Sequence, residues 1–347
     1  MLTTILSTIV LAQPALSISK LRTLQGTHVI ALAPMPGGSK FVASMEDATV
    51  RIIDAKSGAT VMMLKGHPQP AYGVAVNPAG TIIASGDETA RIWLWDAKTG
   101  KKLKEFNRNN GHQRGIQSLS FSKDGTMVAS TGKDDVIILW SVAKGNPVLK
   151  LLGKGANFYG GVFNPAGGSL VTATIGEGAR VYKVNSSQPA YALKGHDGQG
   201  ALDVSVNKVG SIAVTAGKDS KGNVWSLVTR KKMGSLAGHT DFLIHTAFAP
   251  SGRFVATSSS DRTVKVWSLA NFSTVATLDG QSFIGSPICF TSDGRYLISS
   301  TDADAIQIST VNPPQGTGVN PITGPRPKLT KTTVKVNKPL GNKKGGG

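Results

Sequence analysis

Short stretches in which apolar and polar residues alternate recur along the chain at a regular interval. Each unit opens with an apolar alternation that runs into a turn, as in YGVAVNPAG (72–80) and IQSLSFSKDG (116–125). A second short apolar strand follows each turn. A third ends at one of seven positions 41 to 45 residues apart: Ile53, Trp95, Trp140, Tyr182, Trp225, Trp267 and Ile308. Such alternation predicts half-buried strands, and the regular period predicts seven copies of one β unit.

A fourth, more variable strand follows the third strand in six units only. The seventh unit runs from Ile308 into Asn312-Pro313-Pro314, and proline cannot continue a central strand. The missing strand is found at the other end of the chain, where residues 19–24 precede the first unit and lead into the Leu-x-Gly pattern that residues 64–66 repeat. We therefore predict that an N-terminal strand completes the last unit and closes a ring without an open sheet edge.

Four Gly-His pairs mark the beginnings of units, at residues 66–67, 111–112, 195–196 and 238–239, and one third strand ends in Trp95-Asp96. With the period, these features resemble the WD-repeat (tryptophan–aspartate repeat) β-propeller family. The resemblance covers residues 17–312. It implies an all-β fold, a seven-bladed β-propeller of four-stranded antiparallel blades.

The family pattern also implies a hydrogen-bonded tie within a blade, made by a His, a Ser or Thr, an Asp and a Trp. Three blades carry the full set: His112, Ser130, Asp134, Trp140; His196, Thr215, Asp219, Trp225; and His239, Thr257, Asp261, Trp267. A His-Ser-Asp set also occurs in serine hydrolases. Because this set recurs at equivalent positions of three repeats, we interpret it as structural and predict that the protein is not an enzyme.

The other four blades depart from the pattern. Blade 2 keeps His67, Ser85 and Trp95 but has Thr89 at the aspartate position, where Asp87 could substitute. The corresponding positions of blades 1, 4 and 7 are occupied in part by His28, Ala43, Asp47, Ile53, Gly176, Tyr182, Gln281 and Asp302. We expect these three blades to depend on apolar packing, and Asp304 to lie outside any tie.

The composition also limits which disulfides, metal sites and membrane spans the protein can contain. The single Cys289 excludes an intramolecular disulfide and a cysteine-based metal site. Five of the six histidines occupy the signature histidine position of a blade, and no carboxylate cluster accompanies the sixth, His245. We therefore predict no metal and no cofactor. No apolar run reaches the roughly 18 residues of a spanning helix, so we predict no membrane span.

The two ends of the chain differ from the repeats. Residues 1–19 carry no charged side chain, and residues 1–12 resemble a short secretory signal with small or aliphatic residues before Gln13. If they are cleaved, the protein is secreted or periplasmic; if they form an apolar strand instead, it is cytoplasmic. Residues 313–347 hold seven basic residues and no acid, which predicts a disordered basic tail.

A rigid ring without a catalytic set favours a scaffold that binds protein partners, and we expect it to be a monomer. Two alternatives remain: an exported ligand-binding or hydrolytic propeller, and association of the tail with nucleic acid or another anionic polymer or surface. In WD-repeat rings, partners gather on the face that bears the entrances to the first strands. The candidate residues there are Tyr72, Gln117, Tyr159, Leu202, Phe242 and Ile244, with Lys133 and Lys218 in neighbouring turns.

Overall fold

The structure is a computed structural model that describes residues 16–26, 28–106, 108–153, 155, 157–283 and 286–313. The predicted signal segment, residues 1–12, and nearly all of the predicted tail lie outside the described residues. Both therefore remain predictions.

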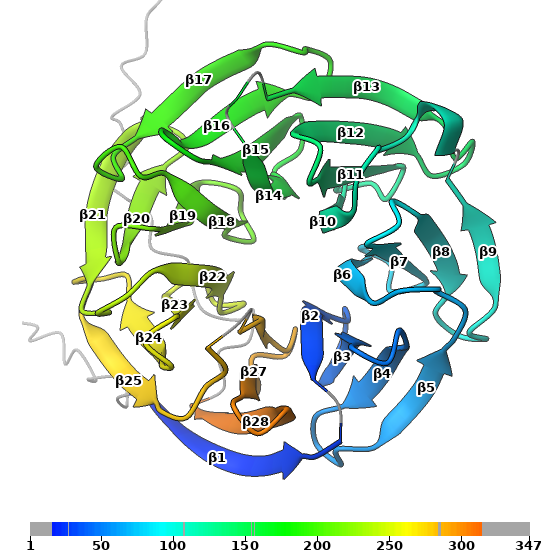
Figure 1. Cartoon of the computed structure of the whole chain (residues 1–347). Coiled ribbons are helices and arrows are strands. Elements are labelled where there is room, and N and C mark those ends of the chain that lie inside the picture. The colour runs from blue at the N-terminus through cyan, green and yellow to red at the C-terminus, as the bar shows by residue number, and fades with distance from the viewer. Residues whose placement is uncertain are drawn as a thin grey trace, which may run out of the picture.

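Seven four-stranded antiparallel sheets stand in a ring around a common centre, which confirms the predicted propeller (Figure 1). A short 3-10 helix, η1 (Arg108–Asn110), interrupts the strands. Blade 1 contains β2 (Val29–Pro34), β3 (Lys40–Met45), β4 (Val50–Asp54) and β5 (Thr60–Leu64); blade 2, β6 (Ala71–Val76), β7 (Ile82–Asp87), β8 (Ile92–Asp96) and β9 (Lys102–Glu105); blade 3, β10 (Ile116–Phe121), β11 (Met127–Gly132), β12 (Val136–Ser141) and β13 (Pro147–Leu152).

The second half of the ring repeats this order, from the inner strand outward. Blade 4 contains β14 (Phe158–Phe163), β15 (Ser169–Thr174), β16 (Gly178–Lys183) and β17 (Pro189–Lys194); blade 5, β18 (Ala201–Val206), β19 (Ile212–Gly217), β20 (Lys221–Ser226) and β21 (Lys231–Ala237); blade 6, β22 (Leu243–Phe248), β23 (Phe254–Ser259), β24 (Val264–Ser268) and β25 (Thr274–Leu278); blade 7, β26 (Ile288–Phe290), β27 (Tyr296–Thr301) and β28 (Ala305–Asn312).

The N-terminal strand β1 (Ser17–Leu24) supplies the outer strand of blade 7, as the sequence predicts. It pairs antiparallel with β28, from Ser17 opposite Asn312 to Leu24 opposite Ile306. The two ends of the described chain therefore lie in one sheet (Figure 1). Without β1, the backbone groups of β28 would form an open edge.

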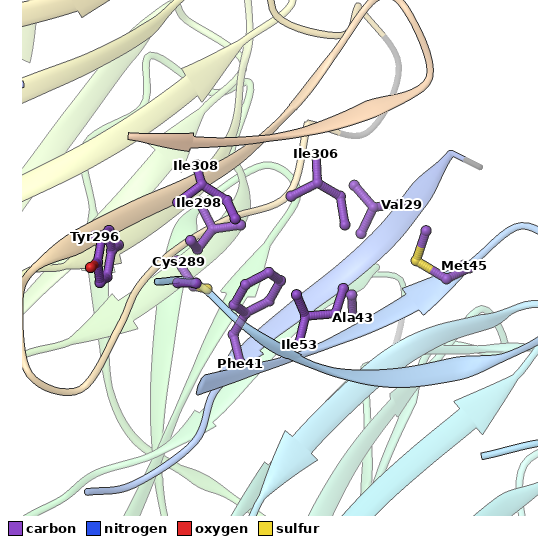
Figure 2. Close-up of a cluster of buried hydrophobic side chains, with 11 residues drawn as sticks. Val29, Phe41, Ala43, Met45, Ile53, Cys289, Tyr296, Ile298, Ile306 and Ile308 are labelled. Atoms are coloured by element: carbon purple, nitrogen blue, oxygen red, sulfur yellow. The ribbon is translucent and has the colours of Figure 1, made fainter. Parts of the chain in front are cut away.

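The hydrophobic core is divided among the seven contacts between neighbouring blades. At the closure, Phe41 and Ile53 of blade 1 pack with Ile298, Ile308 and Cys289 of blade 7 (Figure 2). Isoleucines replace tryptophan at the ends of both third strands there, and all five side chains are buried. This agrees with the predicted reliance on apolar packing. Burial also raises the pKa of the Cys289 thiol to about 12, so it stays protonated and unreactive at neutral pH.

Candidate functional site

A hydrogen-bonded chain runs through blade 3 from its tryptophan to its aspartate. Trp140 Nε1 donates to Ser130 Oγ at 2.7 Å, and Ser130 Oγ lies 2.7 Å from His112 Nε2. His112 Nδ1 lies 2.9 Å from Asp134 Oδ1. Because an ionised carboxylate only accepts, Nδ1–H donates to it; in a neutral imidazole Nε2 is then the acceptor of the Ser130 hydroxyl, which itself accepts from the indole N–H.

Blades 5 and 6 contain the same chain of partners. His196 joins Thr215 and Asp219 at 2.6 and 2.9 Å, and His239 joins Thr257 and Asp261 at 2.8 Å each. Trp225 and Trp267 donate to the two threonine hydroxyls. Each set ties three segments of one blade together: the inner-strand entrance, the second strand and the third strand.

Blade 2 has a fourth tie of the same kind, in which Asp87 takes the aspartate role. Asp87 Oδ2 lies 2.8 Å from His67 Nδ1, and His67 Nε2 lies 2.7 Å from Ser85 Oγ. The other carboxylate oxygen of Asp87, Oδ1, accepts hydrogen bonds from the backbone N–H and the hydroxyl of Thr89. Although Asp87 stands at the end of β7 and not in the turn, its carboxylate thus reaches the histidine.

Burial and hydrogen bonding oppose each other at these carboxylates. Burial favours the neutral acid, but hydrogen bonds from His67, His112 or His239 and from neighbouring hydroxyl and backbone groups outweigh it. The pKa of Asp87, Asp134 and Asp261 therefore falls below the usual value. Burial lowers the pKa of His196 and His239 in spite of their aspartates. Neutral imidazole beside an ionised carboxylate is what the donor order above requires.

The expectation that Asp304 lies outside any tie needs correction. His28 does not bind Asp47: its Nδ1 lies 3.2 Å from Asp304 Oδ1, across the boundary with blade 7. Asp47 instead contacts Thr49 and Arg51 within its own turn. Asp304 is therefore not without a partner, since its turn lies against the residue that enters the first strand of blade 1.

Blade 4 replaces the tie with an ion pair. Arg180 Nε donates to Glu177 Oε2 at 2.8 Å, and Lys194 Nζ lies 3.8 Å from the same carboxylate. Tyr182, at the tryptophan position, is 2% exposed and packs on Phe158 with ring centroids 6.2 Å apart. An aromatic–aromatic contact and a partly exposed ion pair thus hold this blade together.

One face of the ring is hollowed at its centre by a depression of about 830 Å³, here called the mouth. In six blades, the inner strand carries a β-bulge near its beginning, which interrupts its register with the second strand. A bulge re-aims a side chain, and here the bulge residues line the mouth. They are Ile30, Tyr72, Gln117, Tyr159, Leu202 and Ile244.

The mouth gathers some of the candidate binding residues and leaves out two. Tyr72 and Tyr159 are each 40% exposed, whereas Leu202, Ile244 and Gln117 are half-buried. With its nitrogen turned toward the neighbouring carbonyls, the Gln117 amide donates to Phe158 O at 2.9 Å. Phe242 and Lys218 stand outside the mouth, with Lys218 Nζ 5.5 Å from the Phe242 ring centroid.

Two further cations lie over aromatic rings on this face. Lys133 Nζ is 4.8 Å from the Tyr72 ring centroid and 2.8 Å from Glu88 Oε2. The Arg262 guanidinium is 5.8 Å from the ring centroid of Phe283, which lines the mouth and is 49% exposed. The attraction between each cation and the face of its ring stabilises the orientation of the exposed ring.

The sequence candidates did not include several residues that line the mouth, among them Ile30, Phe283, Asp302 and Asp304. The sequence contained a signal for Ile30, because it holds the same place in the first inner strand that Tyr72 holds in the second. Phe283 lies in the loop that enters the least regular blade, so no repeat pattern marks it.

Within the described ranges, no three His, Cys, Asp or Glu side chains are grouped so that they could hold a metal ion. The same ranges contain no helix that is long and apolar enough to cross a membrane. His245 lies on an inner strand with its Nδ1 3.5 Å from Asp203 Oδ2.

Comparison with known proteins finds WD repeats in three parts of the chain. The family model "WD domain, G-beta repeat" matches residues 58–96, 100–141 and 230–268. Nuclear distribution protein nudF of Aspergillus niger is 29% identical over 196 residues, which cover 55% of this chain and 43% of that protein.

Other relatives show the same kind of partial match. WD repeat-containing protein VIP3 of Arabidopsis thaliana is 25% identical over 43% of this chain and 50% of its own length. Angio-associated migratory cell protein of Homo sapiens is 25% identical over 59% of this chain and 50% of its own length. The chain thus spans half or less of the length of these curated relatives.

Proposed function

Because this chain is a WD-repeat β-propeller, we propose that it is a non-enzymatic scaffold that binds a protein partner across the mouth of the ring. The observation that carries the proposal is the row of bulge residues. The bulges turn two tyrosines and several aliphatic side chains out of the blades toward one central depression. Exposed aromatic side chains that remain amphipathic are typical anchors of protein interfaces.

The charges around the mouth would give such a contact specificity. Lys133 lies between Glu88 and Tyr72, and Asp302 and Asp304 line the opposite part of the depression. A partner therefore meets a Lys133–Glu88 ion pair on one side of the hollow and two carboxylates on the other, and this asymmetry fixes its orientation. The hydrogen-bonded tie of blade 2 keeps the blade that carries Tyr72 rigid, so that little conformational entropy is lost there on binding.

The relatives give no support to an exported ligand-binding or hydrolytic propeller. The His-Ser/Thr-Asp sets support the structural interpretation instead. Each histidine Nε2 faces a hydroxyl that already accepts from a tryptophan, and the side chains of His67, His112, His196 and His239 are at most 1% exposed. A substrate could not reach these hydroxyls without disrupting the blade.

The test is affinity capture from native cell extract with the full-length protein as bait. We expect the double substitution Tyr72→Ala, Tyr159→Ala to weaken capture of the native partner at least tenfold. The matched control is Leu103→Ala, Leu152→Ala, which removes two similarly exposed side chains, 52% and 59%, from outer strands. If a folded Tyr72, Tyr159 variant retained every partner while the control lost them, the binding site would lie on the outer rim and the proposal would be wrong.

A further inference from the structure

The end of the ring opposite the mouth carries a ring of basic side chains. In each blade the turns after the first and third strands lie at one end of the sheet, and the turn after the second strand lies at the other. The turn after the first strand and the turn after the third strand contact each other within a blade. Ala97 N donates to Thr81 O in blade 2, and Val142 N donates to Thr126 O in blade 3, each at 2.9 Å.

These turns also meet from blade to blade. Asn164 Nδ2 donates to Gly210 O of the next blade at 3.2 Å, and Gly38 N donates to Ser292 Oγ across the closure at 2.9 Å. They therefore form one continuous surface, here called the turn face. Its cations, at least one from every blade, are Lys40, Lys56, Lys98, Lys101, Lys123, Lys144, Lys183, Lys208, Arg230, Lys231, Arg253 and Arg295.

Four acids share this face with the twelve cations, and each is bound within its own turn. Asp54 accepts from Ser57, Asp96 from Thr99 and Asp124 from Thr126, and Asp293 accepts from Thr291 and the Arg295 backbone. Cations thus outnumber acids three to one. Fourteen of the chain's 20 acidic residues lie instead at strand ends, turns and loops of the mouth face. The charge of the ring is therefore polarised along its axis.

From this geometry we propose that the turn face docks flat on an anionic lipid bilayer. A planar surface can meet cations from all seven blades together, whereas a nucleic-acid duplex, a rod, would contact only a strip of them. The aromatic side chains that are exposed enough to stack on bases, Tyr72, Tyr159, Phe242 and Phe283, belong to the mouth face. The large hydrophobic residues that protrude from the turn face are Val209 and Val228, 50% and 68% exposed.

Two further features agree with a lipid surface. Nine of the twelve cations are lysines, whose compact charge suits a diffuse layer of headgroups better than a single bidentate phosphate site. The sequence that follows β28 also begins at this face, since Val311 N donates to Arg295 O at 2.8 Å. That sequence adds seven basic residues and no acid after Pro313.

The test is sedimentation of the full-length protein with sucrose-loaded vesicles in about 0.1 M KCl, where charges are felt over roughly 10 Å. The vesicles are phosphatidylcholine alone or with about a third phosphatidylserine. We expect binding to the anionic vesicles only, and weaker binding as salt rises. The substitutions Lys56→Glu, Lys123→Glu, Lys208→Glu should lower the partition constant more than about a hundredfold, because each cation near such a surface contributes about fivefold and each glutamate adds repulsion.

The matched control makes the same change in net charge on the other face, with Lys65→Glu, Arg114→Glu, Lys194→Glu, and should lower binding less than about threefold. Glutamine in place of the three turn-face lysines offers a milder variant, which should lower binding roughly a hundredfold while the melting temperature stays that of wild type. Equal losses in the two glutamate variants would overturn the proposal. So would failure of the wild type to bind vesicles when it binds duplex DNA or RNA under the same conditions.

A last comparison distinguishes binding by the turn face from binding by the residues that follow Pro313. In a chain that ends at Pro313, the turn-face substitutions should still lower binding to anionic vesicles. If that chain bound no vesicles, and the substitutions had no effect in the full-length protein, the segment after Pro313 would act alone and the proposed docking face would be refuted.

Discussion

Replacement of Asp261 by alanine is the sharpest test of the blade ties. The carboxylate accepts hydrogen bonds from His239 Nδ1 at 2.8 Å, the Thr240 backbone at 3.1 Å, and the Thr263 backbone and hydroxyl at 3.0 and 2.7 Å. The side chain of His239 is 0% exposed, so its Nδ1–H would lose its carboxylate acceptor and keep only the longer contact with Thr263 Oγ1 at 3.2 Å.

The size of the effect follows from which donors water can reach. A buried donor left without a partner costs about 1–3 kcal/mol. The Thr240 and Thr263 donors lie nearer the surface, can hydrogen-bond to water, and add less. We therefore expect Asp261→Ala to lower the free energy of unfolding by about 1–3 kcal/mol, measured by urea denaturation followed by circular dichroism.

Asp304→Ala serves as the matched control. Asp304 also contacts a histidine, but its side chain is 73% exposed and that of His28 is 22% exposed. An exposed pair of this kind contributes little, so the expected loss is within about 0.5 kcal/mol. Equal losses for Asp261→Ala and Asp304→Ala would refute the idea that the ties stabilise the blades. A double-mutant cycle with His239→Ala should give a coupling above about 1 kcal/mol.

Two further predictions concern closure and pH. Removal of residues 1–24 should lower the melting temperature and promote aggregation, because β28 loses its partner β1. Removal of residues 1–12 should leave the melting temperature unchanged. Equal melting temperatures of the two shortened chains would contradict the closure. Burial lowers the pKa of His196 and His239 from the usual 6.5. At a pH below 6.5 the unfolded chain therefore binds more protons at these two histidines than the folded chain does. The free energy of unfolding should be constant above about pH 6.5 and fall as the pH drops below it. Glutamine at both positions should flatten that fall in melting curves recorded between about pH 7 and 5, and an unchanged slope would count against buried neutral histidines.

The fold could be predicted from the sequence because each blade repeats one local pattern. The third-strand ends at Trp95, Trp140 and Trp267 are regularly spaced, and spacing survives even where Ile53 and Ile308 replace the aromatic residue. The closing strand was found by the same reasoning, since a unit that lacks its fourth strand must obtain it from elsewhere. Local alternation and repeat counting need no knowledge of long-range geometry.

The contacts that could not be predicted depend on how blades meet. His28 and Asp304 are 276 residues apart, and only the angle between blades 1 and 7 brings them together. The substitution of Asp87 for the missing turn aspartate depends on side-chain reach, which the sequence left open. The sequence likewise placed Phe242 and Ile244 at one entrance, but the bulge turns Ile244 into the mouth and leaves Phe242 outside it.

The bulges explain why so regular a ring can carry a specific surface. An unbroken inner strand would place alternate side chains on the two faces of its own sheet, where neighbouring blades would cover them. One extra residue near the beginning of the strand removes Tyr72 from that alternation and points it to the centre of the ring, and Tyr159 lies in an equivalent bulge. The residues beyond each bulge return to the core. A substitution at a bulge position therefore changes what the ring can bind while the ties and the blade contacts remain intact, so binding at the mouth can vary independently of the fold.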